Sequence, residues 1–146
     1  MRINKVGENI SIVYKDRLVF NHSKEQPFIS GVDLDVKYKS VHGTFSVKSK
    51  AKKIFPLTEC TIVSEKSKKI ELIFKNNSIA VNVQIVAKED TLVFTLDANK
   101  DMPYRIVFPS TENGAIFGGG EQYRKLNLKG EKVININLIA KIYQFY

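Results

Sequence analysis

The chain has 146 residues and a formal net charge of +8, and 43% of its residues are hydrophobic, including nine Phe and six Tyr but no Trp. This length and composition fit one folded domain and exclude a TIM barrel, which needs about 250 residues. A membrane-spanning helix needs about 18 consecutive apolar residues. The sequence holds no such run, so we expect no membrane partner.

The N-terminal residues and the number of cysteines indicate the cellular compartment of the protein. The first nine residues mix polar and apolar side chains and lack the apolar core of a signal peptide. Cys60, the single cysteine, has no partner for an internal disulfide. We therefore expect a cytoplasmic protein, and we give no weight to the glycosylation sequons that begin at Asn21 and Asn76.

The positive charge comes almost entirely from lysine, because only four of the 23 basic residues are arginines. Recognition of phosphates and bases usually recruits arginine for bidentate contacts. The lysines also gather in two runs, residues 48–53 and 66–69, between strand-like segments. We interpret these runs as solvated hairpin tips and expect no nucleic-acid partner.

Apolar and polar residues alternate with a period of two along the chain, which predicts β-strands. Residues 9–14 and 17–22 flank Lys15-Asp16 and form a predicted hairpin. In the next strand, residues 28–38, the alternation puts Val32, Leu34, Val36 and Tyr38 on one face and Asp33, Asp35 and Lys37 on the other. We expect the charged face to be solvated.

The same alternation continues to residue 108. It predicts strand segments over residues 45–47, 54–63, 70–74, 78–86, 91–96 and 104–108. Residues 88–90 form a predicted turn, and no helix is expected. About ten short strands with short connections predict an all-β fold, an antiparallel β-sandwich of two packed sheets.

The side chains of this chain do not form a self-contained catalytic or metal-binding pattern. We expect His22 and His42 to lie at the surface, and Cys60 to be a small buried thiol within a strand. Asp33 and Asp35 lie two residues apart, as a carboxylate pair for glycosyl transfer could, but a solvated strand face explains them better. We predict no metal site and no cofactor.

The sequence Ile-Phe-Gly-Gly-Gly-Glu-Gln-Tyr at residues 116–123 is the exception. Three consecutive glycines let the backbone adopt positive φ and approach another surface closely. Such a loop fits either a contact with a ligand or neighbouring domain, or a simple structural turn. It is not a phosphate-binding loop, because the Lys-Ser/Thr pair of that motif is missing.

The flanking segments make the motif more specific. Residues 104–108, the Gly-Gly-Gly-Glu-Gln turn, and Leu-Asn-Leu-Lys-Gly-Glu-Lys-Val at residues 126–133 follow one another in order. Together they resemble the end of the N-terminal β-sandwich of glycoside hydrolase family 31, a galactose-mutarotase-like domain that leads into a catalytic barrel. The Gln after Glu121 resembles bacterial members, including sulfoquinovosidases and other α-glucosidase relatives.

The resemblance implies part of a retaining α-glycosidase whose nucleophile and acid/base aspartates lie on the barrel. The nucleophile motif, similar to Trp-x-Asp-Met-Asn-Glu, is missing from this sequence, so we expect the chain to be inactive alone and to meet carbohydrate only through that barrel. The domain would brace the barrel and lend a loop to the active-site rim. The residues implied for this substrate-rim or domain-interface loop are Gly118, Gly119, Gly120, Glu121, Gln122, Arg124 and Lys129.

Roles within this loop follow from the resemblance alone. The three glycines would supply its conformation, and Glu121 and Gln122 would order it. Arg124 or Lys129 would contact the barrel or an anionic substrate. Glu121 could equally be a charge partner for Lys125 or Arg124, and Lys129-Gly130 could simply form a turn.

The resemblance ends at Val133. We expect a sandwich domain over residues 1–133 and an atypical β-prone tail over residues 134–146, which could be the truncated entry to the barrel. An exposed apolar strand in this tail would favour a homo-oligomer. A stand-alone carbohydrate-binding sandwich that stacks sugars on Tyr and Phe is the alternative function, although it lacks tryptophan.

Overall fold

The computed structural model describes residues 1–41, 44–89, 91–109 and 142–145, which form eleven β-strands. Within these ranges no helix is present, and hence none long and apolar enough to cross a membrane. Every pair of neighbouring strands is antiparallel. The predicted all-β class and antiparallel sandwich are therefore confirmed.

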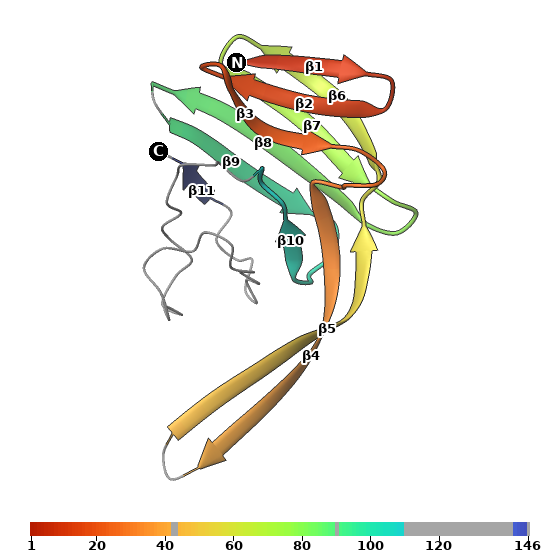
Figure 1. The fold of residues 1–146 in the computed structure, drawn as a ribbon, viewed down its shortest axis with the longest axis vertical. Helices are drawn as coiled ribbons and strands as arrows, with labels where there is room; N and C mark the ends of the chain where they lie inside the picture. The colour runs from red at the N-terminus through yellow and green to blue at the C-terminus, as the bar shows by residue number, and fades with distance from the viewer. Residues whose placement is uncertain (42–43, 90, 110–141, 146) are drawn as a thin grey trace.

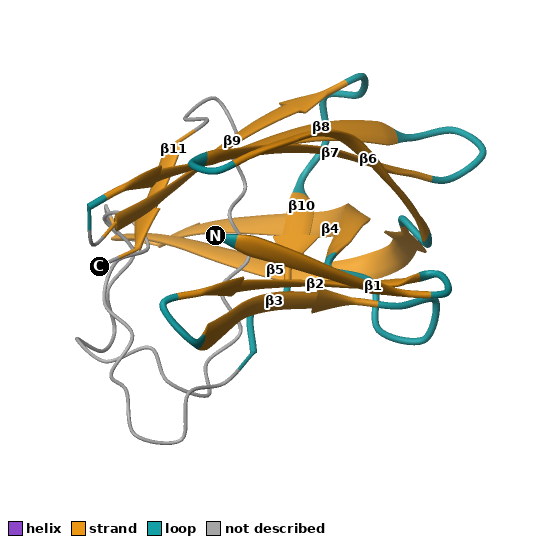
Figure 2. Ribbon diagram, turned by 90° about the horizontal axis from the view of Figure 1, so that it is seen from above, coloured by secondary structure: helices purple, strands orange, loops and turns teal. Residues whose placement is uncertain are grey.

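The strands form two layers (Figure 2). One layer is a five-stranded sheet in the order β11-β9-β8-β7-β6, and the other holds two three-stranded sheets, β1-β2-β3 and β10-β4-β5. We call these the large sheet, the N-terminal sheet and the arm sheet. The strands are β1 (Arg2–Val6), β2 (Asn9–Tyr14), β3 (Arg17–His22), β4 (Ile29–Val41), β5 (Thr44–Pro56), β6 (Glu59–Lys66), β7 (Lys69–Lys75), β8 (Ala80–Lys88), β9 (Thr91–Ala98), β10 (Tyr104–Ile106) and β11 (Ile142–Phe145).

The predicted hairpin of residues 9–22 is confirmed, with both strand boundaries as expected. Lys15 and Asp16 have φ angles of 48° and 60°, the left-handed pair that a two-residue type I′ turn requires. The Tyr14 hydroxyl donates a hydrogen bond to the carbonyl oxygen of Glu89 in the β8–β9 turn. One turn of the N-terminal sheet is thus attached to one turn of the large sheet.

The core lies between the layers and follows the predicted alternation. In β8 and just before it, Ile79, Val81, Val83 and Ile85 are each at most 2% exposed. An aromatic cluster joins the sheets, with ring centroids 4.2 Å apart for Phe20 and Phe28 and 5.5 Å apart for Phe28 and Phe74. This packing removes large apolar side chains from water, which is the main stabilising contribution to the fold.

Two predictions around the first lysine run are wrong. Residues 48–53 are not a hairpin tip, because they lie within β5, which pairs with β4 along its whole length. The predicted strand over residues 54–63 is divided, since β5 ends at Pro56 and β6 begins at Glu59. Between them the fully buried Leu57 donates its N–H to the carbonyl oxygen of Ile29 at 3.1 Å. The second lysine run does lie at a hairpin turn, between β6 and β7.

The β4–β5 hairpin extends well beyond the sandwich (Figure 1). Each of its strands has 13 residues, whereas β10 pairs with β4 only over Ile29, Ser30 and Gly31. We call residues 32–54 the arm. Its root is part of the sandwich, and its far end projects away from it.

We expect Phe28→Ala to lower the free energy of unfolding by about 3–5 kcal/mol, because it removes a ring that contacts Phe20, Phe74 and Phe108. Urea denaturation followed by far-UV circular dichroism measures this change. Leu18→Ala is the control, since Leu18 is 48% exposed and should change stability by only about 0.5 kcal/mol. Equal effects of the two substitutions would contradict the central place of the cluster.

Candidate functional site

The residues of the loop expected from the sequence lie outside the described residues. They are Gly118, Gly119, Gly120, Glu121, Gln122, Arg124 and Lys129. The boundary between residues 133 and 134 also lies there, so the division into domain and tail stays a prediction, as does a homo-oligomer. We call residues 110–141, which include the Gly-Gly-Gly-Glu-Gln motif, the glycine motif segment. The structure describes the residue before this segment, Pro109, and the residue after it, Ile142.

Both ends of the segment are attached next to Phe94 in β9. On the N-terminal side, the ring of Phe108 packs edge-on against Phe94 with 5.7 Å between centroids. On the C-terminal side, Tyr143 of β11 is paired in register with Phe94. The sandwich therefore fixes the positions from which the glycine motif segment starts and to which it returns.

The start of this segment is also attached to the root of the arm. Val107 donates its N–H to the carbonyl oxygen of Phe28 at 2.9 Å, and Val32 donates to the carbonyl oxygen of Pro103 at 2.8 Å. Gly31 lies between them, and a Cβ atom there would approach Ile79 and Met102 side-chain atoms to 3.0 Å. A side chain at position 31 would force the ends of these two side chains to shift, so glycine suits the close packing of β4 at this point.

An open hollow of about 600 Å³ lies along the arm, beside the β-bulge between Asp33 and Leu34. Its lining includes the carboxylates of Asp33 and Asp35, both exposed as predicted. Each faces a lysine of the opposite strand, Lys53 and Lys50 respectively. Each carboxylate is exposed to water and has a lysine opposite it. Neither is therefore the buried acid that glycosyl transfer needs.

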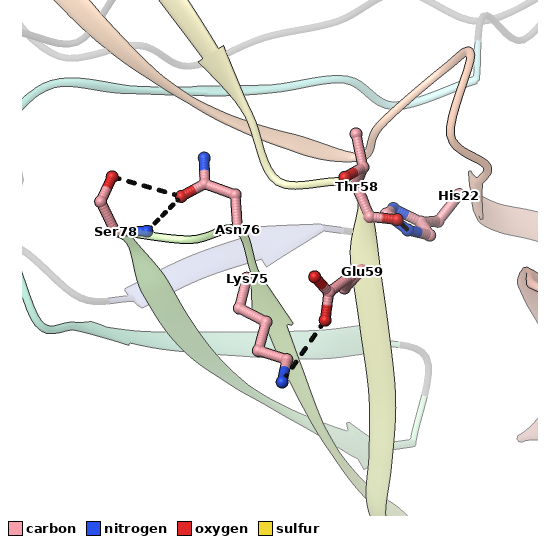
Figure 3. A network of polar contacts seen from close by, with 6 residues as sticks. All are labelled: His22, Thr58, Glu59, Lys75, Asn76 and Ser78. Atoms are coloured by element: carbon pink, nitrogen blue, oxygen red, sulfur yellow. Dashed lines mark hydrogen bonds and ion pairs between the residues drawn. The ribbon is translucent and has the colours of Figure 1, made fainter.

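His22 is fully buried, so the prediction of a surface histidine is wrong for this residue. Its Nδ1 accepts the N–H of Phe28 at 3.3 Å. Its Nε2 donates to the carbonyl oxygen of Thr58, also at 3.3 Å (Figure 3). Burial lowers the pKa of His22, an effect opposed by the hydrogen bond to Thr58. The neutral ring thus joins three chain segments and has no access to a substrate. His42 lies outside the described residues.

Asn76 organises a second set of contacts, shown beside His22 in Figure 3. Its side-chain oxygen accepts the backbone N–H groups of Ser78 and Ile79 at 3.0 and 2.9 Å. Its amide donates to the carbonyl oxygen of Pro56 at 3.0 Å. Asn76 thereby connects the β7–β8 turn to the end of β5, a structural role that sequence reasoning missed because Pro56 is distant in the chain.

Cys60 in β6 is partly buried against the hydrophobic core. Burial raises the pKa of its thiol to about 12, although Lys5 acts in the opposite direction. The thiolate, which is the nucleophilic and metal-binding form, is therefore scarce at neutral pH. Among the described residues no three His, Cys, Asp or Glu side chains lie close enough to hold a metal ion.

With this geometry in place, the chain can be compared with known proteins. No family model and no curated protein matches the sequence. Among solved structures, a glycoside hydrolase family 31 sulfoquinovosidase from E. rectale, in complex with the aza-sugar inhibitor IFGSQ, aligns with 88% of this chain at a TM-score of 0.65 and 20% sequence identity. The chain spans only 19% of that enzyme.

The alignment defines the class of fold. The chain has the fold of one part of a family 31 enzyme, as its resemblance to the family implies. Within the described residues this fold is a sandwich and not a barrel.

Acid should destabilise the protein through His22. Folding lowers its pKa, so the unfolded chain binds the proton more tightly, and the free energy of unfolding should fall as the pH drops below about 6.5. Urea denaturation between pH 7 and 5 measures this slope, which His22→Gln should flatten. An NMR titration of the wild-type imidazole gives a second reading, and a pKa at or above 6.5 would contradict the argument.

Cys60 should react slowly with a disulfide reagent such as DTNB at pH 8. A pKa raised from 9.0 to about 12 reduces the native thiolate fraction roughly a thousandfold. The reaction rate in native buffer is compared with the rate in denaturant, where the thiol is exposed. Similar rates in both conditions would show that the native thiol is accessible.

Proposed function

We propose that the chain is a non-catalytic sandwich domain, N-terminal in position, of a family 31 retaining α-glycosidase. In the intact enzyme it braces the catalytic barrel and contributes a loop to the active-site rim. The observation that carries this proposal is the alignment of 88% of the chain with only 19% of a family 31 enzyme. Such shares are expected when one domain is matched to a multidomain enzyme.

The attachment of the glycine motif segment supports the rim role. Before it, Tyr104 in β10 is buried, and its hydroxyl donates to the carbonyl oxygen of Lys100 at 2.9 Å. After it, β11 pairs with β9 in the large sheet. A loop that presents Glu121 and Gln122 to a neighbouring domain needs such rigid supports, because loosely held groups position a partner poorly.

The substrate class follows from the same proposal. We propose that the whole enzyme cleaves an α-glycoside, either a glucoside or, as the name of the structural neighbour suggests, a sulfoquinovoside. Arg124 and Lys129 would contact the barrel or the anionic group of such a sugar. We also propose a cytoplasmic location, which a single thiol without an internal disulfide partner fits.

A stand-alone carbohydrate-binding module receives less support from the described side chains. Such modules stack sugars on exposed aromatic rings. Of the aromatic residues whose side chains are described, Tyr38 on the arm is the one that is mostly exposed, at 67%. Most of the others lie in the core. A single ring on a projecting hairpin does not form a stacking face.

Hydrolysis assays, the flanking DNA sequence and reconstitution with a barrel test the proposal. We expect the purified chain to hydrolyse neither 4-nitrophenyl α-glucoside nor the α-sulfoquinovoside above background, because the barrel aspartates are missing from its sequence. We also expect the source DNA around this coding sequence to encode a barrel with the Asp motifs in some frame. Joining that barrel to the chain should yield an active enzyme, and the barrel without the chain should be less stable.

Catalytic turnover by the chain alone would contradict the proposal. Unrelated sequence in all frames on both sides of the gene would contradict it independently.

A further inference from the structure

Within the described part of the chain, the arm, residues 32–54, is held to the molecule only at its root. β10 pairs with β4 as far as Gly31, and in the described part of the chain no strand pairs with either outer edge of the arm beyond that point. Figure 1 shows the hairpin extending away from both layers of the sandwich. A two-stranded hairpin without further packing is only marginally stable in water. The arm therefore has two faces available to a partner.

The two faces differ in chemistry, because residues directly opposite in a strand pair lie on the same side. One face carries the pairs Asp33–Lys53, Asp35–Lys50 and Lys37–Lys48. The other carries Val32–Ile54, Leu34–Ala51 and Val36–Ser49. We call them the basic face and the apolar face.

Toward the far end of the arm, the positive charges of the basic face have no acidic residue opposite them. Its first two cross-strand pairs combine Asp with Lys, but the next places Lys37 directly opposite Lys48. No acidic residue occurs between Val36 and Thr58, a stretch that contains six lysines. Like charges directly opposite each other destabilise a hairpin, so this arrangement does not serve the stability of the isolated arm.

The apolar face remains partly exposed to water. Ile54 is 44% exposed, and Leu34 and Val36 are only partly buried. Edge lysines can protect a sheet from unwanted pairing, which would explain the basic residues by themselves. That explanation does not account for an apolar strip on the opposite face of the same hairpin.

We propose that the arm is a docking element for an extended acidic polypeptide strand, which adds to a free outer edge of the arm. Because side chains alternate along a strand, its apolar residues would lie on the face of Leu34, Val36 and Ile54, and its carboxylates on the opposite face with Lys37 and Lys48. One partner would then contact both the apolar face and the basic face. Its negative charge would be complementary to the lysines at the far end of the arm.

Other partner classes satisfy only one face. A nucleic acid would neutralise the lysines and leave the apolar strip in water. A bilayer would cover the apolar strip but would leave the lysines on the side facing away from the headgroups. The inference does not depend on the presence of a catalytic barrel.

Fluorescence anisotropy can test the docking element with defined probes. They are a short peptide that alternates Glu and Val, poly-L-glutamate with the same charge, and a DNA duplex. We expect the alternating peptide to bind most tightly, and its affinity to fall with added salt. Lys37→Gln/Lys48→Gln should weaken this binding about tenfold, whereas the matched control Lys66→Gln/Lys68→Gln at the β6–β7 turn should change it less than about twofold.

Ile54→Ser should remove the preference for the alternating peptide over poly-L-glutamate. Val63→Ser is its control, because Val63 is 56% exposed on β6, outside the arm. Circular dichroism verifies that each variant is folded.

Each remaining outcome overturns the inference. Equal weakening by the two lysine pairs would indicate net charge alone, and tighter binding of the duplex would indicate a nucleic acid. Absence of binding by the wild type would exclude the acidic partner. None of these results bears on the proposed glycosidase domain, which hydrolysis and the flanking DNA test separately.

Discussion

The contact between Phe20, Phe28 and Phe74 is the interaction on which the rest of this structure depends. The three rings come from β3, from the residue before β4, and from β7, so the cluster joins all three sheets. The backbone of Phe28 adds two links, because its N–H donates to His22 and its carbonyl oxygen accepts from Val107. The root of the arm and the end of β10 are therefore positioned by the same residue.

The aromatic cluster stabilises the root of the arm more than its far end. Near the cluster, buried apolar contacts and satisfied backbone groups hold β4 firmly, including the close approach at Gly31. Farther along the arm, the described side chains are exposed or only partly buried, so stability there rests mainly on cross-strand pairing. Regions with few buried contacts open at a lower free energy than the core. The sandwich thus provides a rigid base, and the arm provides an adaptable surface that a partner can order.

A strand of this fold can be predicted from the sequence when one of its two faces is buried. The strands β2, β3 and β8 were predictable because one side of each contacts the core, which enforces alternation. β5 was not, since its arm portion is solvated on its lysine-bearing side and tolerates a polar run that resembles a turn. The burial of His22 also escaped prediction, because its partner Thr58 is 36 residues away and leaves no local signal.

The resemblance to family 31 rests on two observations that involve largely different residues. The glycine motif and its flanks span about 30 residues near the C-terminus, most of them outside the described structure. The fold alignment covers 88% of the chain, so most of it depends on strands that precede the motif. A chance resemblance in one would not produce the other. Since the aligned part is 19% of the neighbouring enzyme, the likeness is one of fold to a single part of that enzyme, and a function has to be argued from a site rather than from the fold.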